Sequence, residues 1–164
     1  MINLEEVGKG HPAECMYLQQ LYELVIEVNA QLVLEIGSGK FTFSRAILKG
    51  LEETGGHLHT CDPIIVPTYT HDRMTFYPVP SDKLAQSWDG DIDFLLIDGD
   101  HSAPQVTKDY YNFKRFVRAG GLIALHDINV PHAAGVKKLW SHIKKSTPVR
   151  LEITSWPGFG VIHV

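Results

Sequence analysis

The feature that most constrains the fold is a repeated pattern: a short apolar run ends on polar or glycine residues, and a stretch with helical spacing follows it. The expected strands and the residues that close them are 32–36 with Gly37-Ser38-Gly39, 92–97 with Asp98-Gly99-Asp100-His101, and 122–125 with His126-Asp127. Strands that are apolar on both faces and separated by helices are typical of a parallel sheet covered on both sides.

The remaining segments complete an alternating α/β order. Further strands are expected at 57–62, 73–77, 149–154 and 159–164, and helices over 15–28, 42–51, 81–88, 103–117 and 136–143. The last two strands are joined by Ser155-Trp156-Pro157-Gly158, which favours a terminal hairpin. The sequence therefore predicts an α/β, Rossmann-like three-layer sandwich with a mostly parallel sheet and a C-terminal antiparallel hairpin.

Length and composition narrow the class of protein. At 164 residues with no repeat or linker, one domain over 1–164 is expected. The net charge of −4 and scattered basic residues argue against a nucleic-acid partner. No run approaches the roughly 20 apolar residues that span a bilayer, and residues 1–15 lack the basic start and apolar stretch of a signal peptide, so none is expected. Cys15 and Cys61 form no CxxC pair. We expect a cytoplasmic protein that does not bind membranes.

Ligands of such sheets bind beyond the carboxyl ends of the strands. Three strand ends therefore outline one crevice, and they carry residues 35–39, 60–62 and 98–101. Gly37 and Gly39 permit a sharp turn and a close approach of a ligand to the backbone. Asp62 ends the second strand, where a carboxylate commonly accepts hydrogen bonds from ribose hydroxyls. The alternative is a tight turn with no ligand. Thr42 replaces the third glycine of a dinucleotide motif, and Glu35 adds negative charge that suits a cationic ligand better than a pyrophosphate.

At these motifs the chain resembles a known family. The stretch VLEIGSGKFTFSRAIL, residues 33–48, resembles the first motif of class I S-adenosylmethionine-dependent methyltransferases. The stretch IDFLLIDGDHSAPQVTKDYYNFKRFVRAGGLIALHDI, residues 92–128, resembles the branch that includes small sugar and macrolide O-methyltransferases and proteins grouped with cephalosporin hydroxylase. The resemblance implies a seven-stranded sheet whose final strand is antiparallel.

The resemblance also implies site residues and a reaction. Glu35, Gly37, Ser38 and Gly39 would line the methionine part of S-adenosylmethionine, and Asp62 would bind the ribose. Ser81 or Asp82 would flank the adenine. The implied reaction is O-methylation of a small hydroxylated, sugar-like acceptor. The acceptor pocket is not defined by the sequence.

Methyl transfer to a hydroxyl needs a base or a metal to handle the proton. Asp98 and His101 follow one strand, and His126-Asp127 follows the next. The resemblance implies His101 and Asp98 as catalytic residues, with His101 as the base and Asp98 also in contact with the cofactor. It further implies Asp98 and Asp127 as magnesium ligands and His126 as a further ligand. A histidine there leaves manganese, zinc or no metal open. The bland alternatives are a helix-capping Asp98, a solvated Asp100 and packed histidines.

Two other readings of the same crevice stay open at this point. One is a nicotinamide- or nucleotide-binding oxidoreductase, and the other is a protein that binds the cofactor without transferring a methyl group. The residues themselves do not decide between O- and N-methylation. They also do not fix the oligomeric state, so a homo-oligomer stays open.

Overall fold

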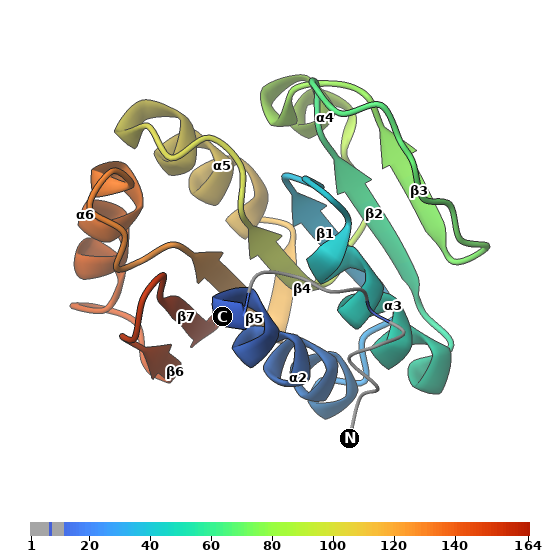
Figure 1. Cartoon of the computed structure of the whole chain (residues 1–164), viewed down its shortest axis with the longest axis horizontal. Helices are drawn as coiled ribbons and strands as arrows, with labels where there is room; N and C mark the ends of the chain where they lie inside the picture. The colour runs from blue at the N-terminus through green and yellow to red at the C-terminus, as the bar shows by residue number, and fades with distance from the viewer. Residues whose placement is uncertain (1–6, 8–11) are drawn as a thin grey trace.

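The structure is a computed structural model that describes residue 7 and residues 12–164. Its elements, in chain order, are α2 (Pro12–Glu27), β1 (Leu32–Ile36), α3 (Thr42–Thr54), β2 (His57–Cys61), β3 (Met74–Tyr77), α4 (Ser81–Ser87), β4 (Ile92–Ile97), α5 (Ala103–Lys114), β5 (Val117–His126), α6 (Ala134–Ile143), β6 (Val149–Ile153) and β7 (Phe159–His163). Figure 1 shows this alternation of strands and helices along the chain.

The strands form one seven-stranded sheet in the order β3-β2-β1-β4-β5-β7-β6. The pairs from β3 to β5 are parallel, whereas β7 is antiparallel to both β5 and β6. The predicted α/β architecture, the mostly parallel sheet and the C-terminal hairpin are therefore confirmed. Because β1, β2, β4 and β5 run in the same direction, their carboxyl ends meet at one edge of the sheet.

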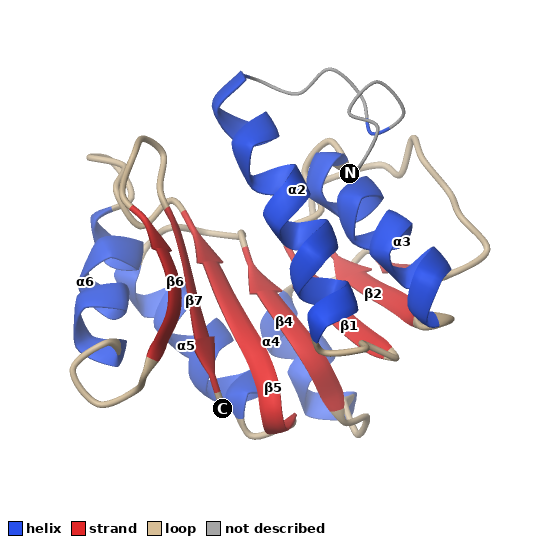
Figure 2. Ribbon diagram, turned by 90° about the horizontal axis from the view of Figure 1, so that it is seen from below, coloured by secondary structure: helices blue, strands red, loops and turns tan. Residues whose placement is uncertain are grey.

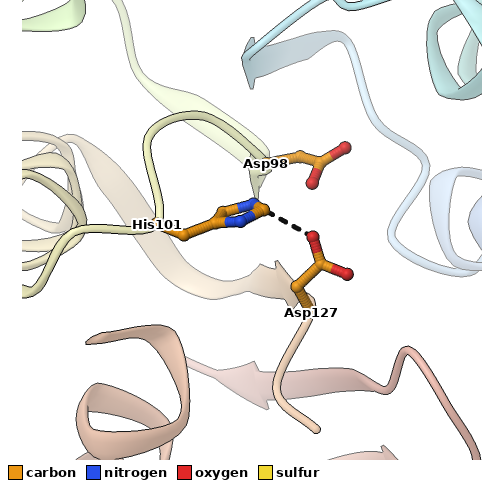
Figure 3. A group of neighbouring side chains, drawn as sticks. All are labelled: Asp98, His101 and Asp127. Carbon is orange, nitrogen blue, oxygen red and sulfur yellow. Dashed lines mark ion pairs between the residues drawn. The ribbon is translucent and has the colours of Figure 1, made fainter. Parts of the chain in front are cut away.

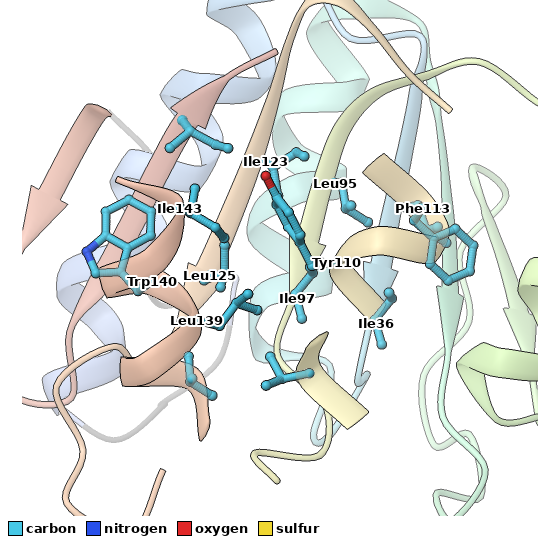
Figure 4. Packing of buried hydrophobic residues seen from close by; sticks show 14 of the residues in the cluster. Ile36, Leu95, Ile97, Tyr110, Phe113, Ile123, Leu125, Leu139, Trp140 and Ile143 are labelled. Atoms are coloured by element: carbon cyan, nitrogen blue, oxygen red, sulfur yellow. The ribbon is translucent and has the colours of Figure 1, made fainter. Parts of the chain in front are cut away.

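Two helical layers cover the sheet, as Figure 2 shows. One apolar cluster joins α4, α5 and α6 to one face, and a second joins α2 and α3 to the other. In the first cluster, Tyr110 and Phe113 of α5 and Trp140 of α6 pack over Leu95 and Leu125 (Figure 4). All six residues of β4 are buried, and from Phe94 to Ile97 the side chains alternate between the two clusters. This explains the apolar run of those four residues.

The start of β5 differs from the sequence-based expectation. We expected a helix to Val117 and a strand from Leu122, but the strand begins at Val117 and includes both intervening glycines. The register with β4 shifts at this point, and Gly120 has a positive φ of 78°. Asp93 holds the irregular segment, since it accepts hydrogen bonds from Arg118 and from the backbone N–H of Leu32. The glycine pair itself is held by the backbone, since Gly120 N–H donates to Val164 O at 2.8 Å and Val164 N–H donates to Gly121 O at 3.0 Å.

Among the described residues, no helix is both long enough and apolar enough to cross a bilayer.

Candidate active site

A cavity of about 570 Å³ lies at the edge of the sheet where the parallel strands end. This volume is in the range of pockets that hold small molecules and cofactors. Its wall draws on the turn after β1, the end of β2, the loop after β4 and the starts of α4 and α5, with Gly37, Gly39, Asp62, Ser81, Asp98, Gln105 and Asp109 among the lining residues. The predicted crevice is thus a formed cavity.

The glycine turn after β1 brings the backbone close to β4. Gly37 has a φ of +91°, and a Cβ there would lie 2.1 Å from the carbonyl oxygen of Asp98. Gly39 has a φ of +46°, and a Cβ there would meet nothing within 4 Å. Gly37 is therefore required for packing, while Gly39 faces open space that a ligand can occupy.

Glu35 and Ser38 lie beneath this turn and outside the cavity wall, contrary to the expectation that they line it. Glu35 is fully buried, and one carboxyl oxygen, Oε2, accepts hydrogen bonds from Ser44 Oγ at 2.5 Å and Thr60 Oγ1 at 2.6 Å. Ser38 Oγ is 2.7 Å from the same Thr60 hydroxyl. These bonds fasten the turn to β2 and α3.

Glu35 also does not supply the expected negative charge. Burial raises its pKa to about 8, and the hydrogen bonds from Ser44 and Thr60 oppose this rise only in part. The carboxyl group is therefore mostly protonated at neutral pH. A neutral group is what an enclosed position without a cation requires, because a buried charge is costly.

Asp62 lines the cavity as predicted from its place after β2. Its Oδ2 accepts from the N–H of Gly39 at 3.3 Å, and its Oδ1 accepts from the N–H of Ile64 at 2.9 Å and of Ile65 at 3.1 Å. The carboxylate thus ties the glycine turn to the loop after β2. It keeps acceptor capacity toward the cavity, because each carboxylate oxygen can accept two hydrogen bonds.

Of the two residues expected near an adenine, the structure places only Ser81 in the cavity wall. Asp82 instead accepts hydrogen bonds from Gln105, Lys108 and Asn112 of α5, each at 3.3 Å. Its position one residue further along α4 turns it to the outside of the cavity. Asp82 therefore joins two helices.

Asp109 of α5 lines the cavity and was missed by the sequence reasoning. It is 1% exposed, and burial raises its pKa while hydrogen bonds from Ser81 and Gln105 oppose the rise. A signal was available, because Asp109 has the spacing of the buried face of α5 that Val106, Tyr110 and Phe113 define. A carboxylate on such a face needs partners.

The second part of the site is a cluster of four ionisable side chains at the ends of β4 and β5, three of which appear in Figure 3. His101 Nε2 lies 3.0 Å from Asp127 Oδ2. His126 Nδ1 lies 3.0 Å from Asp98 Oδ1 and 3.4 Å from Asp127 Oδ1. Asp127 has a φ of 60°, a conformation that aspartate tolerates better than most residues. The predicted convergence of these four residues is present.

The charges in the cluster support one another. The hydrogen bond to Asp127 raises the pKa of His101, against an opposing effect of burial. Burial would raise the pKa of Asp127, but the hydrogen bonds from His101 and His126 outweigh it and hold that pKa well below its usual range. In the same way, hydrogen bonds to Asp127 and Asp98 overcome burial and raise the pKa of His126 to about 10. Asp127 is therefore ionised between two imidazoles.

Of the purely structural roles considered for this loop, a turn residue at Asp100 is found and a helix cap at Asp98 is not. Ser102 is the N-cap of α5, with its side chain accepting from Gln105 N–H at 3.4 Å. Asp100 Oδ1 accepts from Ser102 N–H at 2.7 Å, as expected of a turn residue. Asp98 makes no capping bond and pairs with His126, as given above.

A metal ion would find a different ligand set from the expected one. Among the described residues, the group whose ligand atoms all lie within 4.8 Å of one another is Asp98, His101 and Asp127. We expected His126 in place of His101. His126 lies behind the two carboxylates, packed edge-on against Tyr17 and Phe43, and its Nε2 is buried without a partner.

Comparison with protein families places the described elements in context. A family model described as a methyltransferase domain matches residues 34–128, which include the glycine turn, Asp62 and both polar strand ends. No curated protein matches the chain.

Solved structures share the fold at low sequence identity. An O-methyltransferase from Bacillus cereus in complex with SAH is 19% identical with a TM-score of 0.70, over 98% of this chain and 90% of that one. The O-methyltransferase TomG from Streptomyces achromogenes, with SAM, is 13% identical with a TM-score of 0.73, over 98% and 88%. The MycE methyltransferase of the mycinamycin pathway, with Mg, SAH and mycinamycin VI, is 15% identical with a TM-score of 0.64, over 90% and 49%.

The buried Glu35 predicts a pH dependence of stability. Its pKa is about 8 in the folded chain and about 4.3 when unfolded, so the folded state holds the extra proton between these values. Stability should therefore fall as the pH rises from 5 to 8, by on the order of 3 kcal/mol from this group. Glu35→Gln cannot titrate and should lose that part of the slope, measured by urea unfolding across this range.

The matched control is Glu53→Gln, which removes an exposed carboxyl group from α3. It should keep the wild-type slope. Equal slopes for the wild type and Glu35→Gln would contradict the assignment of a protonated Glu35.

Proposed function

The chain belongs to the class I S-adenosylmethionine-dependent methyltransferases, and we propose that it methylates a hydroxyl group of a small hydroxylated, sugar-like acceptor. We propose further that residues 1–164 act as one methyltransferase domain. The observation that carries the proposal is that the cavity and the Asp98–His101–Asp127 cluster share one edge of the sheet, with Asp98 belonging to both. The match of the methyltransferase family model to residues 34–128, which include this edge, argues against the alternative of a nicotinamide- or nucleotide-binding oxidoreductase.

The cavity suits the cofactor in size and chemistry. S-adenosylmethionine supplies an electrophilic methyl group on a sulfonium. Gly39 leaves room for the methionine part against the turn, and Asp62 is placed to accept hydrogen bonds from the ribose hydroxyls. Glu35 and Ser38 act from below by holding the turn in position. Asp98 lies where the cavity meets the group of Asp98, His101, His126 and Asp127, which we call the reacting cluster.

His101 is the proposed general base. It is half-buried, and Asp127 accepts a hydrogen bond from its Nε2 at 3.0 Å, which fixes the ring and favours uptake of a proton. The acceptor hydroxyl loses its proton to His101 as its oxygen attacks the methyl carbon in line with the sulfur. Asp127 then stabilises the imidazolium, as the third member of other base assemblies does.

The choice of oxygen over nitrogen rests on the chemistry of this base. A neutral amine that attacks a sulfonium needs no proton removed beforehand, whereas a hydroxyl profits from a base in reach. An imidazole held by a carboxylate therefore suits a hydroxyl acceptor. The structural similarity to O-methyltransferases and to a protein solved with mycinamycin VI supports the same proposal.

A divalent cation is a second candidate role for the cluster, favoured by the spacing of its ligand atoms. Two carboxylates and one imidazole are donors that manganese and magnesium accept, with the imidazole better suited to manganese. Asp98, His101 and Asp127 would hold the ion, which would polarise the acceptor oxygen. Coordination through His101 Nε2 would replace the hydrogen bond from this nitrogen to Asp127, so a bound ion and that hydrogen bond exclude each other.

Cofactor binding tests the first part of the proposal. We expect SAH to bind the purified protein in calorimetry with a micromolar-range Kd. Asp62→Ala should raise that Kd by roughly tenfold or more, because it removes charged hydrogen bonds to the ribose. Asp72→Ala, which removes an exposed carboxylate, serves as the control and should bind as the wild type does. A wild-type Kd in Asp62→Ala would contradict the ribose assignment.

The titration of His101 tests the proposed base and needs no acceptor. In the wild type without added metal, the His101 ring signal in NMR should titrate above pH 6.5, since Asp127 stabilises the charged form. In Asp127→Asn the titration should move to lower pH, because the charge is lost and burial remains. Asp72→Ala, which removes an exposed carboxylate, serves as the control and should leave the His101 titration unchanged. An unmoved His101 titration would show that Asp127 does not support it.

Metal binding is tested with Mn²⁺ alone. The metal candidate predicts one Mn²⁺ site per chain in calorimetry and its loss in Asp98→Asn. No heat at millimolar Mn²⁺ would remove this candidate and leave the Asp127–His101 pair as the means of handling the proton.

A further inference from the structure

The end of the cavity away from the reacting cluster is built from three polar side chains that contact one another. Ser81 Oγ donates to Asp109 Oδ1 at 2.5 Å, and Gln105 Nε2 donates to the same oxygen at 2.9 Å. Gln105 Nε2 also lies 3.2 Å from Ser81 Oγ. All three line the cavity. They form an ordered polar wall around one buried carboxylate.

The second oxygen of that carboxylate is not used in this way. Both donors reach Oδ1, and no described residue donates a hydrogen bond to Oδ2. An ideal Cβ on Gly99, in the loop that lines the cavity, would lie 3.8 Å from Oδ2, so this oxygen is close to the cavity wall. Oδ2 does not belong to the fully enclosed side-chain atoms that lack a partner, so it is open to the cavity and can accept a hydrogen bond from a ligand.

The order of the strands indicates which part of the cofactor lies here. The reacting cluster stands at the ends of β4 and β5, and Asp62 stands at the end of β2. Ser81 opens α4, which follows β3, the edge strand beyond β2. A cofactor with its sulfonium at β4 and its ribose at β2 extends its base toward β3, and therefore toward Ser81 and Asp109.

We propose that Asp109 Oδ2 accepts a hydrogen bond from the exocyclic amino group of the cofactor's adenine, which makes Asp109 the residue that selects a 6-amino purine. This assignment rests on the proposed cofactor site. Ser81 and Gln105 orient the carboxylate by occupying Oδ1. A 6-oxo purine presents an acceptor at this position and would face Oδ2 without a hydrogen, so the site rejects it.

Asp82, the sequence-based candidate for the same contact, does not fit it. Its two oxygens already accept from three residues of α5, and it lies outside the cavity wall. The carboxylate that reads the base therefore comes from α5, and the one on α4 holds α5 in place.

The experiment compares three ligands by calorimetry: SAH, S-inosylhomocysteine and the N6,N6-dimethyl derivative of SAH. The wild type should bind SAH roughly tenfold or more tightly than either analogue, since neither donates a hydrogen from position 6. Asp109→Asn presents an amide that can donate to a 6-oxo group, so it should reduce or invert the preference for SAH over S-inosylhomocysteine. Asp89→Asn, the loss of an exposed carboxylate, should keep the wild-type ratio.

The outcomes separate this inference from the proposed function. Tight binding of all three ligands by the wild type, or an unchanged ratio in a folded Asp109→Asn, would overturn the role of Asp109 and leave the cofactor site intact. No binding of any ligand by the wild type would overturn both. If Asp109→Asn does not fold, the wild-type affinities still test the proposal, because S-inosylhomocysteine lacks the amino hydrogens without added bulk at position 6, and the dimethyl derivative lacks them while keeping the adenine ring.

Discussion

The contact between the ends of β1 and β4 is the constraint on which the site depends. Asp98 N–H donates to the carbonyl of Ile36 at 2.8 Å, and the backbone of Gly37 approaches the Asp98 carbonyl so closely that no Cβ fits between them. This contact brings the glycine turn and the first residue of the reacting cluster to one edge. The cavity lies over this junction, and so the proposed transfer occurs there.

Charge is distributed around the junction according to what each position can support. Glu35 sits under the turn without a cation and is neutral by virtue of its raised pKa of about 8. Asp127, at the reacting end, is ionised because His101 and His126 both bond to it. His126 is buried against Tyr17 and Phe43, which places a positive charge behind the carboxylates and away from the cavity. The proposed base, His101, and its carboxylate partner Asp127 are thus already paired in the structure.

The sequence predicts the architecture well because period and strand ends are local signals. The apolar run of β4 and the residues after it place Asp98 and His101, and the same logic places Asp62 and Asp127. The sequence pattern does not predict the direction in which an individual side chain points. Glu35 and Ser38 go beneath the turn, and Asp82 turns outward, because packing against neighbouring elements decides these directions. Asp109 lies on the helix face that Tyr110 and Phe113 share, and its spacing marks it as buried.

A crystal structure of the protein with SAH bound tests the central claim most directly. The account predicts density in the cavity with the ribose hydroxyls on Asp62 and the sulfur directed toward the side of the sheet that carries His101 and Asp127. A ligand bound elsewhere, or a sulfur that faces away from His101, would contradict the account.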